Sequence, residues 1–390
     1  MKGNPWRGVV YCFFWYMSIF CGWLLLCLPL LPLLFFDVRI YRVAMDLIFA
    51  TWEIYPVALM ELLFETEFVM SGDQVRPWER SILVMNHRTR LDWNFLWGAM
   101  HYGTTSPAHR LKFILKSPIR HFPGPGWVMQ MAGFFFIHRK WERDQELLDK
   151  MIGHMEDLDY TYQVLIFPEG TDLTEKSLNR SNAYADKNGL SHYSQVLHPK
   201  TTGYTYMVNR MRTGNHIDAV YDLTVGYPDT LPETESDVLR GFFPSRVHFN
   251  IQRYGIDDIP TGDEGVKNWL CSLWKDKEEK LTNFYAPSNP EERHFDDPQQ
   301  KLNKWPRPLS NAVYLAAVCW TGLVLTCIFM FIAYSWFKFY VLCACAAFAA
   351  LSYSGEGMFH AEIAWAQRQK AKNEPPINGG IGTNGRVKSE

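Results

Sequence analysis

The apolar residues of this 390-residue chain are concentrated toward its two ends. No charged residue lies within residues 9–36, a run longer than the roughly 20 residues that a helix needs to cross a bilayer. Two further charge-free runs, 311–337 and 339–355, follow one another near the C-terminus. The pattern predicts an N-terminal transmembrane anchor over residues 1–40 and a two-helix transmembrane hairpin over residues 309–358.

The segment after the first apolar run stays apolar but is interrupted by acidic residues. Asp46, Glu53, Glu61 and Glu65 would fall within one broad stripe of a helix. Such a pattern predicts an amphipathic helix over residues 41–70 that lies along the membrane surface. The same acidic stripe could equally pack against a soluble domain, and the sequence leaves both interpretations open.

The middle of the chain alternates strand-like and helix-like runs, which is typical of an α/β domain. This catalytic-domain candidate covers residues 71–285, and a proline-rich linker follows over residues 286–308. The last segment, 359–390, is predicted to be a disordered tail because glycine and polar residues dominate its end. The predicted strands are 82–85, 134–137, 164–167, 219–227 and 247–251.

Charge and cysteine usage exclude several classes of protein. The formal net charge is only -2, so no strong global field would attract nucleic acid. Seven of the eight cysteines lie in apolar stretches, and the sequence contains no C-x-x-C pair and no Cys/His cluster at zinc-like spacing. We therefore expect neither a disulfide framework nor a metal site.

Two histidine–aspartate pairs have a spacing of five residues, and their contexts differ. His154 and Asp159 belong to a helical pattern, where residues five apart do not share a face, so we interpret them as solvated helix surface. His87 directly follows a buried-strand run, and Asp92 precedes an apolar helix pattern, where it would be a natural N-cap. A loop held at both ends can fold Asp92 back against His87.

This arrangement suits the acylation of an alcohol. A hydroxyl is a poor nucleophile until a base removes its proton as it attacks a thioester carbonyl. His87 can be that base, and Asp92 would fix the imidazole tautomer and stabilise the imidazolium, as in a Ser-His-Asp triad whose serine is replaced by the substrate hydroxyl.

Three further strand ends carry polar motifs, at residues 133–139, 167–172 and 225–228. Together with Asn86, His87 and Asp92 they resemble the four ordered motifs of the glycerolipid acyltransferase family, which includes 1-acylglycerol-3-phosphate acyltransferases. The resemblance implies a mixed-sheet α/β acyltransferase domain flanked by transmembrane helices. It also implies that His87 and Asp92 form the catalytic dyad.

The resemblance assigns the polar head of the acceptor lipid to Arg139 with Glu169, Gly170 and Thr171. Many family members carry arginine at the next position, where this chain has Asp172. A carboxylate there would repel a free phosphomonoester more than a phosphodiester or polyol head.

A local basic stretch supplies further candidates for phosphate binding. It contains Arg110, Lys112, Lys116 and Arg120, and its alternative interpretation is a solvated face. Lys200 is a weaker candidate of the same kind.

Longer strings narrow the resemblance to the lysocardiolipin and lysophosphatidylinositol acyltransferase branch. The branch implies an acyl-CoA-dependent lysophospholipid acyltransferase that remodels phospholipid acyl chains, with acyl-CoA as co-substrate and no cofactor. The alternatives are a 1-acylglycerol-3-phosphate acyltransferase that makes phosphatidic acid, a CoA-independent transacylase and a non-catalytic lipid-binding membrane protein. The strings are 85–93, 138–141, 167–174, 180–183 and 197–199.

We expect a multi-pass protein of the endoplasmic reticulum membrane. Because acyl-CoA is held in the cytosol, the catalytic domain and the tail should be cytosolic, and one preceding span would leave the N-terminus in the lumen. Lys2 and Arg7 weakly oppose a lumenal N-terminus by the positive-inside tendency. The sequence leaves the oligomeric state open.

Overall fold

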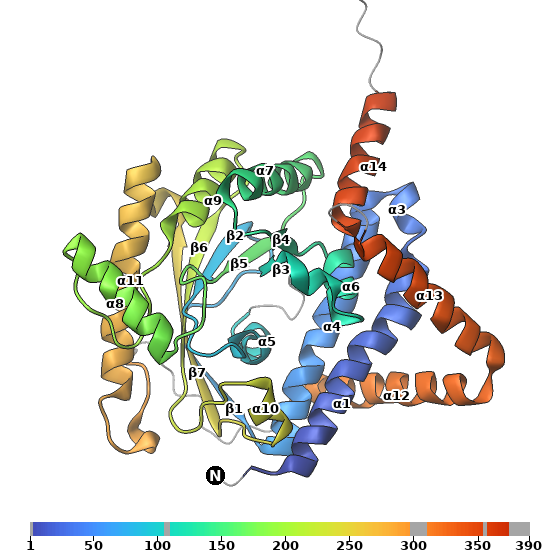
Figure 1. Cartoon of the computed structure of the whole chain (residues 1–390), viewed down its shortest axis with the longest axis horizontal. Helices are drawn as coiled ribbons and strands as arrows, with labels where there is room; N and C mark the ends of the chain where they lie inside the picture. Colours follow the sequence, from blue (N-terminus) through green and yellow to red (C-terminus); the bar gives the residue numbers. More distant parts are fainter. Residues whose placement is uncertain (1–2, 105–109, 297–309, 354–356, 374–390) are drawn as a thin grey trace, which may run out of the picture.

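A seven-stranded mixed sheet forms the centre of the computed structural model, which describes residues 3–104, 110–296, 310–353 and 357–373 (Figure 1). The strand order is β1-β7-β6-β2-β5-β3-β4, and only β6 and β7 pair antiparallel. The expected mixed-sheet α/β fold is therefore confirmed. The strands are β1 Glu67–Gly72, β2 Ser81–Met85, β3 Leu111–Lys116, β4 Phe135–Ile137, β5 Gln163–Ile166, β6 Ala219–Gly226 and β7 Arg246–Gly255.

Helices cover both faces of this sheet (Figure 1). Those of the catalytic domain are α5 Asp92–Tyr102, α6 Pro125–Met131, α7 Trp141–Asp157, α8 Glu175–Asn188, α9 Thr201–Thr213, α10 Glu235–Leu239 and α11 Asp263–Tyr285. The short helical turns are η2 Ser117–His121, η3 Ile256–Asp258 and η4 Pro290–Glu292. Most of the proline-rich linker predicted over residues 286–308 lies outside the described residues.

The remaining helices come from the two ends of the chain. The N-terminal set is α1 Pro5–Gly22, η1 Trp23–Cys27, α2 Leu28–Leu30, α3 Leu33–Phe36 and α4 Val38–Phe64, and the C-terminal set is α12 Asn311–Ala333, α13 Ser335–Tyr353 and α14 Met358–Asn373. Within the described residues, four stretches are long and apolar enough to cross a membrane, namely Pro5–Phe36, Val38–Phe64, Asn311–Ala333 and Ser335–Tyr353. The expected N-terminal stretch and C-terminal hairpin are among them, and α4 is an addition.

All five predicted strands occur within a few residues of their expected bounds, but β1 and β3 were missed. β3 contains Lys112 and Lys116 of the basic stretch, and these charges interrupt its apolar pattern. Lys112 is fully buried on this strand, and its ammonium lies 2.5 Å from the Asp46 carboxylate. A buried cation in a strand breaks the apolar pattern on which the prediction depended.

Two acidic residues of α4 pack against the catalytic domain, which favours the second of the two interpretations left open by the sequence. Asp46 pairs with Lys112 of β3, and Glu61 accepts a hydrogen bond of 2.6 Å from Tyr102 of α5. Both carboxylates are buried. Since buried charges require partners, these contacts fix α4 to the domain.

The two ends of the Pro5–Phe36 stretch both contact the catalytic domain. At its start, Gly8 lies so close to Leu239 that an added Cβ would be 2.3 Å from the Leu239 carbonyl oxygen. Just after its end, Arg39 donates a hydrogen bond of 3.3 Å to the carbonyl of Asp159. Both ends of the stretch therefore lie against the catalytic domain, whereas a straight span would separate them.

The tail predicted to be disordered from residue 359 instead continues helix α14 as far as Asn373, while residues 374–390 lie outside the described part of the chain. A buried ion pair holds this helix. Arg42 of α4 contacts both carboxylate oxygens of Glu362, with Nε–Oε1 at 2.7 Å. Phe359 lies over the same guanidinium at 4.7 Å. The polar composition of the tail gave no sign of this partner 320 residues away.

His154 is also not on a solvated surface, as the sequence had suggested. It is 5 % exposed, and its Nε2 lies 3.0 Å from Glu362 Oε1. The prediction was wrong because α14 covers this face of α7, which no local pattern could show.

We predict that Glu362→Ala destabilises the protein by about 3–5 kcal/mol, because it leaves the Arg42 guanidinium buried without its partner. Asp157→Ala is a control for the contacts of α14, since it breaks the exposed Asp157–Lys370 pair that joins this helix to α7 and should cost about 0–1 kcal/mol. Thermal unfolding of the detergent-solubilised proteins measures both. Equal losses would contradict a special role for the buried pair.

Candidate active site

The predicted dyad is assembled at the carboxyl end of β2. His87 Nδ1 lies 2.9 Å from Asp92 Oδ2, and the Asp92 side chain is fully buried. Asp92 is the first residue of α5 and not its N-cap, which is Leu91. Its Oδ2 instead accepts a hydrogen bond of 3.0 Å from the Thr89 backbone N–H within the loop. The N-cap assignment was therefore wrong, but the expected fold-back of Asp92 is correct.

The imidazole of His87 is held on several sides. Its ring stacks on Phe167, with the centroids 4.4 Å apart and the planes 29° apart. Its backbone N–H donates to Glu169 Oε1 at 3.1 Å, and its carbonyl accepts from Leu173 N at 2.8 Å. Because Nδ1 is engaged by Asp92, Nε2 is the nitrogen left for a substrate proton.

The charge state of His87 depends on Asp92. Burial by itself lowers the pKa of His87, but the hydrogen bond and negative charge of Asp92 outweigh burial, and the pKa is raised above its ordinary value. Glu169 and Asp172 add to the increase. An imidazolium at this position would therefore be stabilised.

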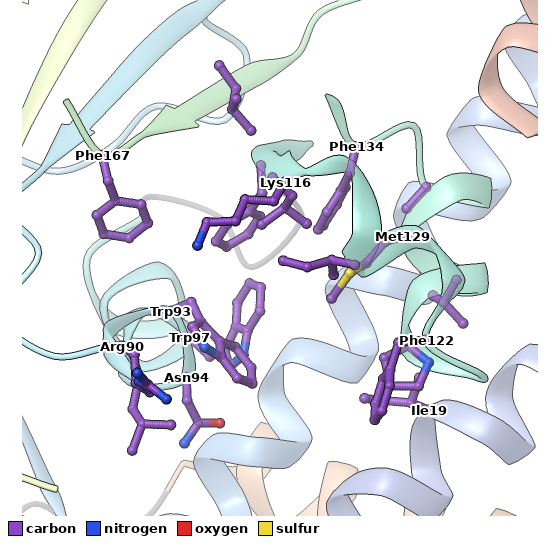
Figure 2. Close-up of a pocket in the computed structure, with 18 of the residues that line it drawn as sticks. Ile19, Arg90, Trp93, Asn94, Trp97, Lys116, Phe122, Met129, Phe134 and Phe167 are labelled. Carbon is purple, nitrogen blue, oxygen red and sulfur yellow. The ribbon is translucent and has the colours of Figure 1, made fainter. Parts of the chain in front are cut away.

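A chamber of about 1220 Å³ opens beside His87. Its walls come from the membrane-type helices α1 and α4 and from α5, β3 and α6 of the catalytic domain. Figure 2 shows Trp93, Trp97, Phe134 and Met129 gathered around it. The walls are predominantly apolar, as an acyl chain requires.

Three candidate cations line the same chamber. Lys116 ends β3 and extends across the cavity in Figure 2. Arg139, at a backbone φ of 61°, donates a hydrogen bond of 2.8 Å to the Gly170 carbonyl. Burial, followed by the positive charges of Arg139 and Arg180, lowers the pKa of Lys200. Lys116, Arg139 and Lys200, three of the expected cations, therefore all line the chamber.

Gly170 has a structural requirement for glycine. Its φ is +72°, and a Cβ would lie 3.0 Å from the Lys200 ammonium. The next two residues, Thr171 and Asp172, also line the chamber, and the Thr171 hydroxyl donates to Asp172 Oδ1 at 3.1 Å. Asp172 in turn lies 3.9 Å from Arg90 Nε. Asp172 thus lines the chamber, and its negative charge is partly offset by the nearby guanidinium of Arg90.

Glu169, which the resemblance assigned to the polar head of the acceptor, lies outside the lining of the chamber. It is 2 % exposed and lies behind the chamber wall. One carboxylate oxygen accepts from the His87 backbone N–H and the other accepts from Leu197 N, both at 3.1 Å. Burial raises the pKa of Glu169 to about 7, although these hydrogen bonds act against the increase. Glu169 therefore positions the His87 loop.

Only one member of the basic stretch reaches the site. Lys112 is paired with Asp46 in the core, and Arg110 lies 4.7 Å from the ring centroid of Tyr160. Arg120 is buried outside the chamber lining. Lys116 alone contributes to the chamber wall, so neither interpretation of the stretch holds for all four residues.

Sequence reasoning assigned no role to two residues that support the dyad. Asn86 exchanges hydrogen bonds with the Val225 backbone, at 2.8 Å and 3.1 Å, and so links the ends of β2 and β6. Tyr227 follows β6, and its hydroxyl donates to Asp92 Oδ1 at 2.6 Å. Their position at strand ends was the available signal, since the carboxyl ends of parallel strands meet at one edge of a sheet.

A histidine base with a buried carboxylate partner, beside a long apolar chamber, is the equipment of an enzyme that transfers acyl chains. Comparison with known families agrees. The acyltransferase model matches residues 67–227, and the acyltransferase C-terminus model matches residues 237–320. The chain belongs to the acyltransferase family.

Named relatives share most of the chain. A lysocardiolipin acyltransferase of Mus musculus is 46 % identical over 281 residues, which cover 72 % of this chain and 74 % of the relative. A lysophosphatidylinositol acyltransferase of Caenorhabditis elegans is 36 % identical, and the aligned part covers 65 % of this chain and 66 % of the relative. A 1-acyl-sn-glycerophosphate acyltransferase from Thermotoga maritima, known from a crystal structure, is 16 % identical in sequence and has a TM-score of 0.48. The alignment covers 72 % of this chain and 98 % of that chain.

We predict that His87→Ala and Asp92→Asn each lower the turnover rate by roughly 100-fold to 10,000-fold, because each removes a part of the base. In the wild type, kcat/KM should fall as the pH drops through the raised pKa of His87, since only the neutral imidazole accepts a proton. The acid limb should therefore lie above about 6.5. Near-normal turnover by purified His87→Ala protein would refute the dyad.

Proposed function

We propose that this protein is an acyl-CoA-dependent lysophospholipid acyltransferase that remodels phospholipid acyl chains, with a lysophosphatidylinositol, lysocardiolipin or related acceptor. The observation that carries the proposal is the His87–Asp92 pair at the wall of the apolar chamber. The names of the relatives support the acceptor class.

The reaction follows from the geometry of the dyad. His87 Nε2 takes the proton of the acceptor hydroxyl while the hydroxyl oxygen attacks the thioester carbonyl of acyl-CoA. The tetrahedral intermediate then collapses, the C–S bond breaks, and the imidazolium returns its proton to the CoA thiolate. Asp92 stabilises the imidazolium throughout.

The chamber suits two lipid substrates at once. Its volume of about 1220 Å³ exceeds the roughly 300–1,000 Å³ of ordinary small-molecule pockets, which supports simultaneous entry of acyl chains from donor and acceptor. Phosphate groups of either substrate would meet Lys116, Arg139 and Lys200 at its edge.

The decisive experiment supplies purified protein with one labelled acyl-CoA and a panel of lysophospholipids. Label from the acyl-CoA should appear in phosphatidylinositol or cardiolipin products. A labelled diacyl phospholipid supplied without acyl-CoA should give no such transfer. Equal transfer from a labelled diacyl phospholipid without acyl-CoA would identify a transacylase instead. His87→Ala protein provides the background rate.

We predict that Asp172→Arg raises the use of lysophosphatidic acid relative to lysophosphatidylinositol. The new guanidinium would stand near Arg90 and Arg139 and attract a phosphomonoester dianion. Asp186→Arg is a charge-matched control on α8 outside the chamber lining, and it should leave the ratio unchanged. An unchanged ratio in Asp172→Arg protein would mean that the carboxylate does not face the head group.

We further propose that the protein resides in the endoplasmic reticulum membrane with its catalytic domain in the cytosol, where acyl-CoA is available. The N-terminus would lie on the same side, since residues at the start of α1 pack against α10. Lys2 and Arg7 agree with this orientation by the positive-inside tendency.

Glycosylation tests the orientation. Asn179 is exposed on α8 within an Asn-Arg-Ser acceptor sequence, so we predict that it stays unmodified in the membrane-inserted protein. An acceptor sequence on a long loop inserted after Tyr334, between α12 and α13, should be glycosylated. A glycan on Asn179, detected as a mass shift that glycosidase reverses, would place the catalytic domain in the lumen.

A further inference from the structure

Every oxygen of the Asp92 carboxylate has a partner, and one partner comes from a distant strand. Oδ2 contacts His87 Nδ1 at 2.9 Å and accepts from Thr89 N at 3.0 Å. Oδ1 accepts a hydrogen bond of 2.6 Å from the hydroxyl of Tyr227, which directly follows β6. The tyrosine lies 135 positions further along the chain, so only the sheet brings it to the dyad.

Tyr227 is placed to act on Asp92 and not on substrate. It is 3 % exposed and lies outside the chamber lining. Burial, followed by the negative charge of Asp92, holds the pKa of Tyr227 well above its ordinary value, so the hydroxyl keeps its proton throughout the working pH range. It is therefore a permanent donor.

The position of Tyr227 is itself fixed by α11. Its backbone N–H donates to the Tyr285 hydroxyl at 3.1 Å, and the Arg88 guanidinium lies 4.9 Å from the centre of the Tyr285 ring. Arg293 approaches the same ring at 5.7 Å. The ring of Tyr227 also packs edge-on against Phe95 of α5. The donor is thus held by both helices that flank the strand end.

We propose that Tyr227 is a positioning residue of the acyl-transfer dyad, which orients the Asp92 carboxylate toward His87 and limits how strongly that carboxylate attracts the imidazolium proton. The inference rests on the proposed base role of His87. A hydrogen bond to Oδ1 withdraws negative charge from Oδ2 and fixes the rotation of the carboxylate.

The sign of the expected effect follows from this charge sharing. Without the Tyr227 hydroxyl, the Asp92 carboxylate keeps more charge on Oδ2 and stabilises the imidazolium more strongly. The acid limb of kcat/KM then moves to higher pH. The other charged or titratable groups facing the pair stay in place, namely the charged Glu169, Asp172 and Arg88 and the neutral phenol of Tyr285.

We predict that Tyr227→Phe lowers kcat by roughly 5-fold to 30-fold, because the carboxylate loses its fixed orientation, and shifts the acid limb upward by about 0.5–1 pH unit. KM for the lysophospholipid should change less than twofold, because Tyr227 does not touch substrate. The readout is a pH profile of kcat/KM for purified protein in detergent micelles.

Tyr221→Phe is a matched control on β6, the strand that Tyr227 directly follows. Tyr221 is also fully buried and also donates to a carboxylate, Glu79 Oε2 at 2.5 Å, but this pair lies away from the chamber. Loss of its hydroxyl should reduce thermal stability without moving the acid limb. An equal shift in both variants would mean that the effect comes from general loosening of β6.

Two further variants test the idea without disturbing packing. Fluorotyrosine at position 227 keeps the shape of the ring but makes the hydroxyl a stronger donor, so the acid limb should move downward, opposite to Tyr227→Phe. In an Asp92→Asn background, Tyr227→Phe should cause little additional loss, because it acts through that carboxylate. An unmoved limb in the fluorinated protein, or additive losses in the double variant, would overturn the proposal.

The outcome for Tyr227 is separable from the proposed function. If His87→Ala is inactive while the Tyr227 variants keep the wild-type pH profile, the dyad stands and the positioning role fails. If His87→Ala is active, the base assignment fails, whatever the tyrosine variants do.

Discussion

The buried carboxylate of Asp92 is the constraint on which the site depends. A negative charge can be kept out of water only if its oxygens are satisfied, and here the donors come from the His87 loop and from the end of β6. These strand ends are in turn tied by Asn86, which bonds the Val225 backbone in both directions. The geometry of the dyad therefore depends on the geometry of the sheet, because a shift in strand register would remove hydrogen-bond partners from the Asp92 carboxylate.

The same rule applies to two buried ion pairs that hold the helices from the ends of the chain: one joins α4 to the catalytic domain, and the other joins α4 to α14. Asp46 of α4 meets Lys112 of β3, and Arg42 of α4 meets Glu362 of α14. Each pair joins elements that are far apart in the sequence. Removing one partner would destabilise the fold strongly, because the other charge would stay buried and unpaired. The apolar helices thereby become chamber walls with fixed positions, and the chemistry takes place beside a space suited to acyl chains.

Local patterns predicted much of the architecture. Strands read from continuous apolar runs were found, because a strand buried on both faces has few alternatives. β1 and β3 were missed, and helix α14 was taken for a disordered tail. In β3 and α14 the local signal was weakened by residues, Lys112 and Glu362, whose partners lie elsewhere in the chain. The solvated interpretation of His154 failed for the same reason.

The sequence by itself determined the apolar ends, the central α/β domain and the identity of the dyad, since His87 and Asp92 are close in the chain and one loop can join them. Tertiary structure alone decided that Glu169 supports the His87 backbone, that Lys116, Arg139 and Lys200 line one chamber, and that Tyr227 reaches Asp92. The physical reason is the distance along the sequence over which each interaction acts. Helix and strand periodicity depends on neighbours in sequence, whereas a buried polar atom is satisfied by whatever group the packed sheet brings within hydrogen-bonding distance.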